Sequence, residues 1–292
     1  MKELLKKLRK FEIRIRKEID TQMQGDFHSV FKGTGLEFDD VRAYQYGDDV
    51  RSIDWNVSAK GHGTFIKTYR EEKEQSVFLI LDVSGSQAIG PEKNQKIDIG
   101  KEICGILALT AVKQAASIGL ICISDQKEKY IRPGKGIEHA YSLIKSVVEL
   151  KPLSLKTNLG LGIKNALGII KRRSIILLIS DFIDRNYEKE LSMLARKHEL
   201  IVVQLMDQRE QNFPALGILP LRDTESGIVS WVNTSAASFR KKYLDDLNRN
   251  REKLQQICRK NKADYLLIDT SEDYVPQLVN LFRIRKKTRK SA

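Results

Sequence analysis

The sequence predicts an α/β protein with a doubly wound, mostly parallel sheet and helices on both faces, preceded by an N-terminal helical and loop-rich extension. From about residue 75 onward, short apolar runs alternate with longer segments of helical periodicity. The short runs are apolar throughout, as expected for parallel strands buried on both faces. Two of them lead directly into an aspartate, Asp82 and Asp181. Because open sheets of this kind place their sites at the carboxyl ends of the strands, both aspartates are candidate functional residues.

The composition is that of a globular protein with a large core. The 292 residues are 41% hydrophobic and 30% charged. No apolar stretch approaches the roughly 18 residues of a membrane span, and the N-terminus lacks the apolar region of a signal peptide. Three cysteines without a Cys-x-x-Cys pair exclude a disulfide scaffold and a zinc ribbon. We therefore expect a cytoplasmic protein.

The first half of the sheet region has five expected elements. Residues 76–81 form a short apolar strand, and residues 97–116 are long and apolar enough all round to be a buried helix. Residues 120–124 again have the pattern of a strand. Two helical patterns, residues 137–150 and 159–170, follow before the next strand.

The second half continues the alternation. Residues 174–180 are rich in β-branched side chains and predict a strand, and residues 188–197 predict a helix. A strand at residues 200–206 precedes a long helix at residues 236–260. The remaining expected elements are a strand, residues 263–268, and a helix, residues 275–282.

Residues 24–72 have a different character, being rich in glycine, aspartate and aromatic residues. They contain the tetrapeptide Asp-Asp-Val-Arg twice, at residues 39–42 and 48–51. Carboxylates interleaved with arginines predict a salt-bridged polar loop region, and residues 65–69 predict an edge strand leading into the sheet. A calcium loop is the alternative, but the spacing does not match Asp-x-Asp-x-Asp-Gly.

The net charge of +13 is concentrated at the two ends of the chain. Residues 1–20 carry eight Lys or Arg and four acids, and residues 283–290 carry six Lys or Arg and no acid, which leaves +3 for the rest. This distribution argues against a nucleic-acid-binding face on the body.

The first segment has an apolar helical stripe, which fits either a helix packed on the body or a helix lying on an anionic membrane surface. Peripheral contact with the inner face of the membrane through the basic ends therefore stays open. The stripe consists of Leu4, Leu8, Phe11, Ile15 and Ile19. We divide the chain into an N-terminal segment (residues 1–72), a sheet domain (73–285) and a basic tail (286–292).

Oxygen-bearing side chains gather where the predicted strands and helices meet. Asp82, Ser84 and Ser86 follow the first strand, Thr157 precedes a helix, and Asp181 follows a later strand. Each piece alone also fits a structural role, such as an N-cap or a turn. Together they form an all-oxygen set suited to Mg²⁺ or Mn²⁺ and unsuited to zinc. With only two carboxylates, a bound ion would keep the capacity to accept a carboxylate from outside.

The same carboxylates allow an alternative, a metal-dependent hydrolase that uses Asp82 and Asp181. Phosphatases with an aspartyl nucleophile commonly have a second acid two residues on, where this chain has Ser84. No histidine stands near either carboxylate in the sequence to act as a base. A phosphate-binding Gly-x-x-x-x-Gly-Lys-Ser/Thr loop is also missing from the sequence. We therefore favour a protein that is not an enzyme.

The set Asp82, Ser84, Ser86, Thr157 and Asp181 resembles the metal-ion-dependent adhesion site of the von Willebrand factor type A fold. Residues 33–42 and 44–56 resemble the signature of the bacterial domain-of-unknown-function family fifty-eight. This resemblance implies a von Willebrand factor A-like domain that binds Mg²⁺. It also implies an adaptor or co-chaperone role beside a MoxR-type AAA+ ATPase, with the ATPase or its client protein as partner.

Overall fold

The computed structural model describes residues 36–61, 63–71, 76–91, 95–113, 115–211, 215–222 and 227–290. The N-terminal helix predicted from the stripe between Leu4 and Ile19 lies outside the described residues. The boundary predicted at residues 72–73 also lies outside them. The chain divides into two compact units, one of Lys32–Gln75 and one that contains Ser76–Ala292.

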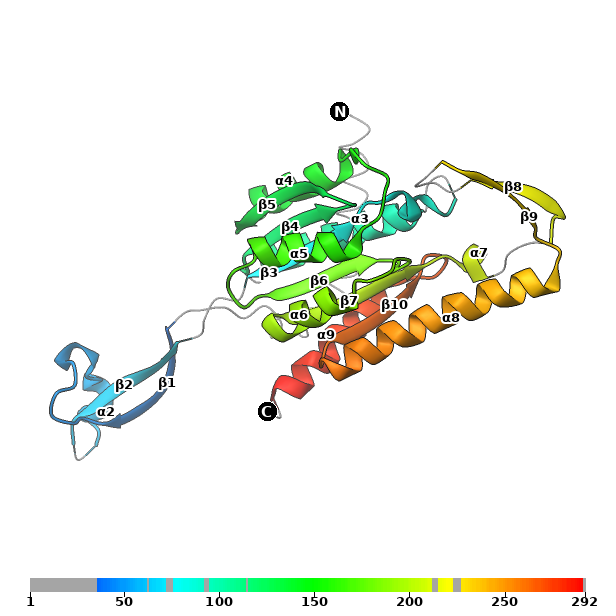
Figure 1. Cartoon of the computed structure of the whole chain (residues 1–292). Helices are drawn as coiled ribbons and strands as arrows, with labels where there is room; N and C mark the ends of the chain where they lie inside the picture. Colours follow the sequence, from blue (N-terminus) through cyan, green and yellow to red (C-terminus); the bar gives the residue numbers. More distant parts are fainter. Residues whose placement is uncertain are drawn as a thin grey trace. The chain divides into compact units, whose positions relative to one another are not determined.

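The larger unit is built on a six-stranded sheet in the order β10-β7-β6-β3-β4-β5 (Figure 1). All neighbouring strands are parallel except β4 and β5, which are antiparallel. The predicted doubly wound, mostly parallel sheet is thereby confirmed. The strands are β3 (Val77–Asp82), β4 (Ile118–Ile123), β5 (Lys127–Gly134), β6 (Ile175–Ser180), β7 (Glu199–Met206) and β10 (Asp264–Asp269).

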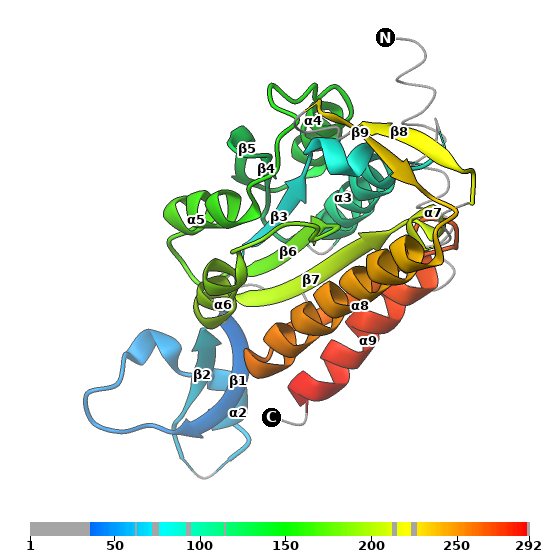
Figure 2. The same cartoon turned by 45° about the vertical axis from the view of Figure 1, so that its right-hand side comes forward.

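Helices cover both faces of this sheet (Figures 1 and 2). One face carries α3 (Lys96–Lys113), α4 (Ile137–Val148) and α9 (Val275–Lys290). The other carries α5 (Leu159–Ile169), α6 (Glu188–Lys197) and α8 (Ala237–Lys260). Each group packs on its own cluster of buried side chains, so the core has two layers separated by the sheet.

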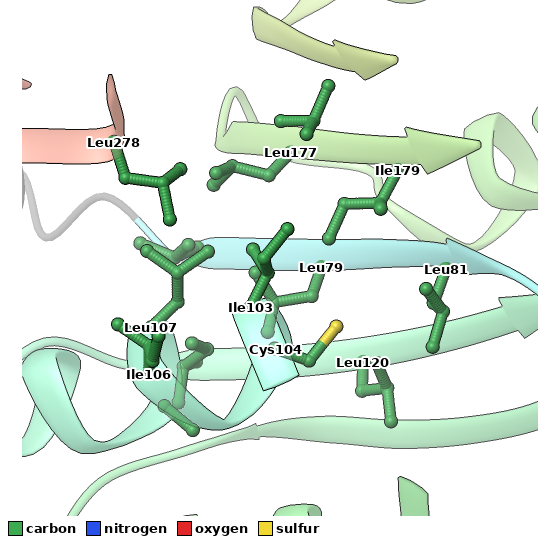
Figure 3. Packing of buried hydrophobic residues seen from close by; sticks show 14 of the residues in the cluster. Leu79, Leu81, Ile103, Cys104, Ile106, Leu107, Leu120, Leu177, Ile179 and Leu278 are labelled. Atoms are coloured by element: carbon green, nitrogen blue, oxygen red, sulfur yellow. The ribbon is translucent and has the colours of Figure 1, made fainter. Parts of the chain in front are cut away.

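Strand β3 shows how the two layers arise. Successive side chains of a strand point to opposite faces, so Leu79 and Leu81 lie in the same buried cluster as Ile103 of α3 (Figure 3). Ile80 belongs to the cluster on the opposite face. All six residues of β3 are buried. Helix α3 lies close to the strand because Gly100 has no side chain: a Cβ there would lie 2.8 Å from Cδ1 of Leu81.

Two parts of the larger unit are not in the predicted series of elements. Strand β5 is an edge strand with several charged residues and no fully buried one, so it lacks the apolar run that marks the buried strands. Between β7 and α8, the short helix α7 (Gln208–Gln211) leads to a hairpin of β8 (Ile218–Arg222) and β9 (Val229–Asn233). The exposed side chains of this hairpin include Ile218 and Trp231.

The last helix is longer than predicted. Helix α9 continues to Lys290, whereas the sequence predicts an end at residue 282 and a basic tail from residue 286. Arg285 makes ion pairs with Glu199 at 2.9 Å and with Asp264. At least one cation of the basic C-terminal end therefore serves to hold α9 against the edge of the sheet.

The smaller unit corrects one prediction. The strand expected at residues 65–69 is present as β2 (Phe65–Glu71), but it does not join the main sheet. It pairs antiparallel with β1 (Leu36–Ala43) in a two-stranded sheet of its own. Strand β1 is missing from the predicted series because its charged residues, including Asp39, Asp40 and Arg42, conceal the strand pattern.

The carboxylates of the smaller unit form ion pairs and helix caps. Arg42 of the first tetrapeptide donates to both oxygens of Asp48 in the second, at 2.8 and 2.7 Å, as the prediction of a salt-bridged region requires. This pairing lowers the pKa of Asp48. Asp49 caps the 3-10 helix η2 (Val50–Ser52), and Asp54 caps α2 (Trp55–Ser58). Asp48, Asp49 and Asp54 thus have structural roles in the smaller unit.

Candidate metal centre

The candidate site lies at the carboxyl edge of the sheet, where β3 and β6 end side by side. The two strands are paired in parallel, with Leu81 opposite Ile179. Asp82 and Asp181 therefore arrive at the same edge, as predicted. Ser180, the last residue of β6, links the two strand ends because its Oγ donates a 2.6 Å hydrogen bond to Oδ2 of Asp82.

The loop after β3 folds back on the carboxylate of Asp82. Both the backbone N–H and the hydroxyl of Ser84 donate to Oδ1 of Asp82, at 3.0 and 2.6 Å. The chain then enters the 3-10 helix η3 (Gly85–Ala88), which places Oγ of Ser86 3.2 Å from Oγ of Ser84. Two neighbouring ligands of an octahedral Mg²⁺, each roughly 2.0–2.1 Å from the ion, lie about 2.9 Å apart. The two hydroxyls, joined by a hydrogen bond, are about 0.3 Å farther apart than such ligands.

Backbone hydrogen bonds bring the loop of Thr157 to this site. The N–H of Gly85 donates to the carbonyl of Leu155 at 2.8 Å, and the N–H of Asp125 donates to the carbonyl of Lys156 at 2.9 Å. These bonds fix the two residues before Thr157. The side chain of Asn158 caps α5 by accepting from the N–H of Leu161, so Thr157 is not the N-cap of this helix.

The carboxylate of Asp82 is buried beside a second acidic group. Only 2% of the residue is exposed, and burial together with the charge of Asp181 raises the pKa of Asp82 to about 6. Hydrogen bonds from Ser180 and Ser84 act in the opposite direction. A cation placed between the two carboxylates would relieve their repulsion, so the electrostatics of the site favour one.

A lysine that the sequence analysis does not single out supplies a cation to Asp181, but not to Asp82. Lys96, at the start of α3, is fully buried, and its Nζ donates to Oδ2 of Asp181 at 2.6 Å and to Oε1 of Glu210 at 2.7 Å. Burial alone would lower the pKa of Lys96, but the two carboxylates outweigh it and the pKa is raised. The other oxygen of Asp181 accepts from the N–H of Ile183 at 3.1 Å. Both oxygens of the Asp181 carboxylate thus already accept a hydrogen bond, one from Lys96 and one from Ile183.

A known protein family matches most of the chain. The family described as "Protein of unknown function DUF58" matches residues 40–253, which is more than half of the 292 residues. The chain belongs to the DUF58 family. The match confirms the resemblance seen in the N-terminal signature, and the matched range includes all five candidate ligands.

Relatives of this DUF58 protein have been found in mycobacteria. It is 24% identical over 285 residues to "Uncharacterized protein Rv1480" of Mycobacterium tuberculosis and to "Uncharacterized protein Mb1516" of Mycobacterium bovis. Each alignment covers 96% of this chain and 89% of the relative. The likeness therefore extends through both units of the structure.

Solved structures with a similar arrangement of elements are distant in sequence. The conserved hypothetical protein BatB from Bacteroides thetaiotaomicron is 13% identical, with a TM-score of 0.46 over 74% of this chain and 99% of that one. The SpRpn10 VWA domain is also 13% identical, with a TM-score of 0.39 over 70% of this chain and 94% of that one. For this DUF58 protein, functional conclusions therefore depend on its own residues.

The polar groups of the candidate site in this DUF58 protein are carboxylates and hydroxyls, with the ammonium group of Lys96 beside Asp181. Among the hydrogen bonds of the described residues, none joins a histidine to Asp82 or Asp181, and His139 contacts the carbonyl of Ile118 instead. No group of three or more His, Cys, Asp or Glu that could hold a metal occurs in this part of the chain either. The candidate set instead combines two carboxylates with three hydroxyls.

None of the described helices has the length and apolarity needed to cross a bilayer.

Proposed function

We propose that this chain is a non-enzymatic protein-interaction module that binds a partner through a divalent metal ion at the carboxyl edge of the sheet. The ion is Mg²⁺, with Mn²⁺ as a substitute, because every candidate ligand is an oxygen. When bound, it supplies an open coordination position for a carboxylate from the partner. The residues that would hold it are Asp82, Ser84, Ser86, Thr157 and Asp181.

The observation that carries this proposal is the pair of serine hydroxyls beside a buried carboxylate. Ser84 donates its one proton to Asp82, so its oxygen is the acceptor in the 3.2 Å contact with Ser86, and the same lone pairs would face a cation placed there. Asp82 does not need to move to serve a cation there, because Ser84 and Ser180 already fix its two oxygens. The site is therefore organised before an ion arrives, which favours binding.

A local comparison shows why the carboxylate and the first serine are not sufficient. At the end of β10, Asp269 accepts from the N–H and the hydroxyl of Ser271 at 2.9 and 2.6 Å, nearly the same bonds that join Asp82 and Ser84. Such a turn alone is a common cap of a strand end. The loop after β3 differs in having Ser86, the opposing Thr157 loop and Asp181 beside it.

Thermal unfolding with Mg²⁺, with Mn²⁺ and with chelator tests the metal site. An ion at 100 times its dissociation constant stabilises by about 2.7 kcal/mol, which for 150–250 residues raises the midpoint by roughly 5–11 °C. We expect this rise in the wild type and its loss in Asp82→Asn and Ser86→Ala. Asp269→Asn is the matched control and should keep the rise. An equal response of Asp82→Asn and the wild type would contradict the metal site.

The partner we propose is a MoxR-type AAA+ ATPase or its client protein, with this chain as adaptor or co-chaperone. Size-exclusion chromatography of the mixed full-length proteins would detect the complex. It is run in Mg²⁺, once with ATP and once without. We expect co-elution that Ser86→Ala weakens and Asp269→Asn does not. Co-elution that is unchanged in Ser86→Ala would separate the ATPase interaction from the metal site.

A further inference from the structure

Large exposed aliphatic side chains lie on the segments that carry candidate ligands of the metal centre. Four of them lie on the two loops that carry Thr157 and Asp181 or on the helix turn that follows. We call these four residues the apolar rim. The exposed fractions are 86% for Leu153, 55% for Leu155, 41% for Leu161 and 39% for Ile183.

The rim is held in place by hydrogen bonds of its backbone. The carboxylate of Glu128 accepts from the N–H of Leu153 at 2.8 Å and from that of Ser154 at 3.1 Å. The carbonyl of Leu155 accepts from Gly85, in the loop that carries the two serine ligands. The exposure of these leucines is therefore a property of an ordered loop next to the site.

The other half of the rim is tied in the same way. The carboxylate of Asp184 accepts from the N–H of Leu159 at 2.7 Å, which joins the loop after β6 to the first turn of α5. This bond joins the segment that carries Ile183 to the one that carries Leu161. Single exposed apolar residues are ordinary, but several on connected segments around one polar site are typical of an interaction surface.

Among the exposed charged residues near the rim, cations outnumber acids. The exposed cations on the same segments are Lys151, Lys156, Lys164 and Arg185. The acids Asp125, Glu128 and Asp184 nearby are half-buried, and the carboxylates of Glu128 and Asp184 accept from backbone N–H groups. Glu149, two residues before Lys151, is an exposed acid. A negatively charged partner would therefore meet complementary charge on its approach.

We propose that the partner segment is an acidic peptide in which an aspartate or glutamate is flanked by large apolar side chains. The apolar rim binds the flanking side chains, and the surrounding lysines and arginine attract the segment. That the central carboxylate binds the ion rests on the function proposed above. A flat anionic membrane would also satisfy the cations and the leucines, but it offers no protruding carboxylate for the recessed oxygens of Asp82 and Ser84, which are buried.

A library of random 12-residue peptides displayed on phage, selected on the full chain in Mg²⁺ and in chelator, tests this proposal. We expect enriched peptides with an acid flanked by apolar residues. The best peptide, made synthetically, should bind at least about tenfold more weakly to Leu153→Ser/Leu155→Ser and to Leu161→Ser/Ile183→Ser. The matched control Ile137→Ser/Met193→Ser removes exposed side chains of α4 and α6 and should bind as the wild type does.

Each outcome separates the two proposals. Rim-dependent binding of acidic apolar peptides that persists in chelator would support the rim and refute the metal-dependent function. Mg²⁺-dependent binding that is unaffected in both rim variants would refute the rim and support the metal site. A selection without enrichment, or with peptides lacking the acid, overturns the proposal. Co-sedimentation with phosphatidylglycerol vesicles that only the rim variants lose would then assign the surface to a membrane.

Discussion

The buried ammonium group of Lys96 gives the sharpest prediction about stability. Lys96→Met keeps an unbranched apolar stem in place and removes only the charge that Asp181 and Glu210 share. Both carboxylates are nearly inaccessible to water, with 2% and 6% of their residues exposed. Each retains one backbone donor, from Ile183 and from Asp207. The variant therefore leaves two buried negative charges without a counter-charge.

The expected loss is large. Removing one partner of a buried ion pair destabilises by about 3–5 kcal/mol. For 150–250 residues, each kcal/mol corresponds to a midpoint change of roughly 2–4 °C, so the midpoint should fall by about 6–20 °C. The assay is thermal unfolding in chelator at neutral pH, followed by circular dichroism. Lys96→Met/Glu210→Gln should recover part of the loss, because it neutralises one of the two unpaired carboxylates.

A surface lysine provides the control. Lys253 of α8 pairs with Glu188 of α6, but its side chain is 58% exposed. Ion pairs at such positions contribute about 0–1 kcal/mol, so Lys253→Met should lower the midpoint by only a few degrees. A Lys96→Met midpoint no lower than that of Lys253→Met would refute the reasoning, because it would mean that water reaches the carboxylates of Asp181 and Glu210.

Three further predictions concern ionisation and packing. Because its pKa is about 6 when folded and 3.8 ordinarily, Asp82 stabilises the metal-free protein in acid and loses this contribution as the pH rises through about 6. Mg²⁺ needs the ionised form, so its stabilising shift in thermal unfolding should be smaller at about pH 5 than at about pH 7.5. In urea unfolding, Gly162→Ala should destabilise by about 1–3 kcal/mol, since its Cβ would lie 2.6 Å from a buried isoleucine of β4. Gly168→Ala, in the same helix and with nothing within 4 Å, should stabilise by about 0.5–1 kcal/mol. Burial raises the pKa of Cys122 to about 12, so iodoacetamide should label it in urea and not in the native protein, as read by mass spectrometry.

The sequence predicts those elements in which consecutive residues are apolar. Strands β3, β6 and β7 are short apolar runs that alternate with helices along the chain. This pattern is typical of a parallel sheet buried on both faces. Strands β1, β5, β8 and β9 have at least one exposed face and carry charged or polar residues, so a search for buried runs does not detect them. Their positions depend on pairing with a neighbour, which a single segment does not reveal.

The same distinction separates the site residues that the sequence predicts from those that it does not. Asp82 and Asp181 follow directly from the rule that sites lie at the carboxyl ends of parallel strands. The Lys96 and Glu210 pair could not be predicted, because 114 residues separate the two and each has the sequence context of an ordinary helix residue. What signals Lys96 is its position at the start of an otherwise buried helix, and only the packing of α3 against β6 and α7 turns that position into an ion pair.

The central position of β3 has a consequence for how the site can respond to a partner. With β6 and β4 on its two sides and helices on both faces, β3 should open to hydrogen exchange only when the whole larger unit unfolds. Asp82 is anchored to this slowest-exchanging segment. Any local opening that alters the site must therefore occur in one of three loops: the loop after β3, the loop before α5 or the loop after β6. Amide exchange that is fast in residues 151–158 and slow in β3 would show which side of the site moves.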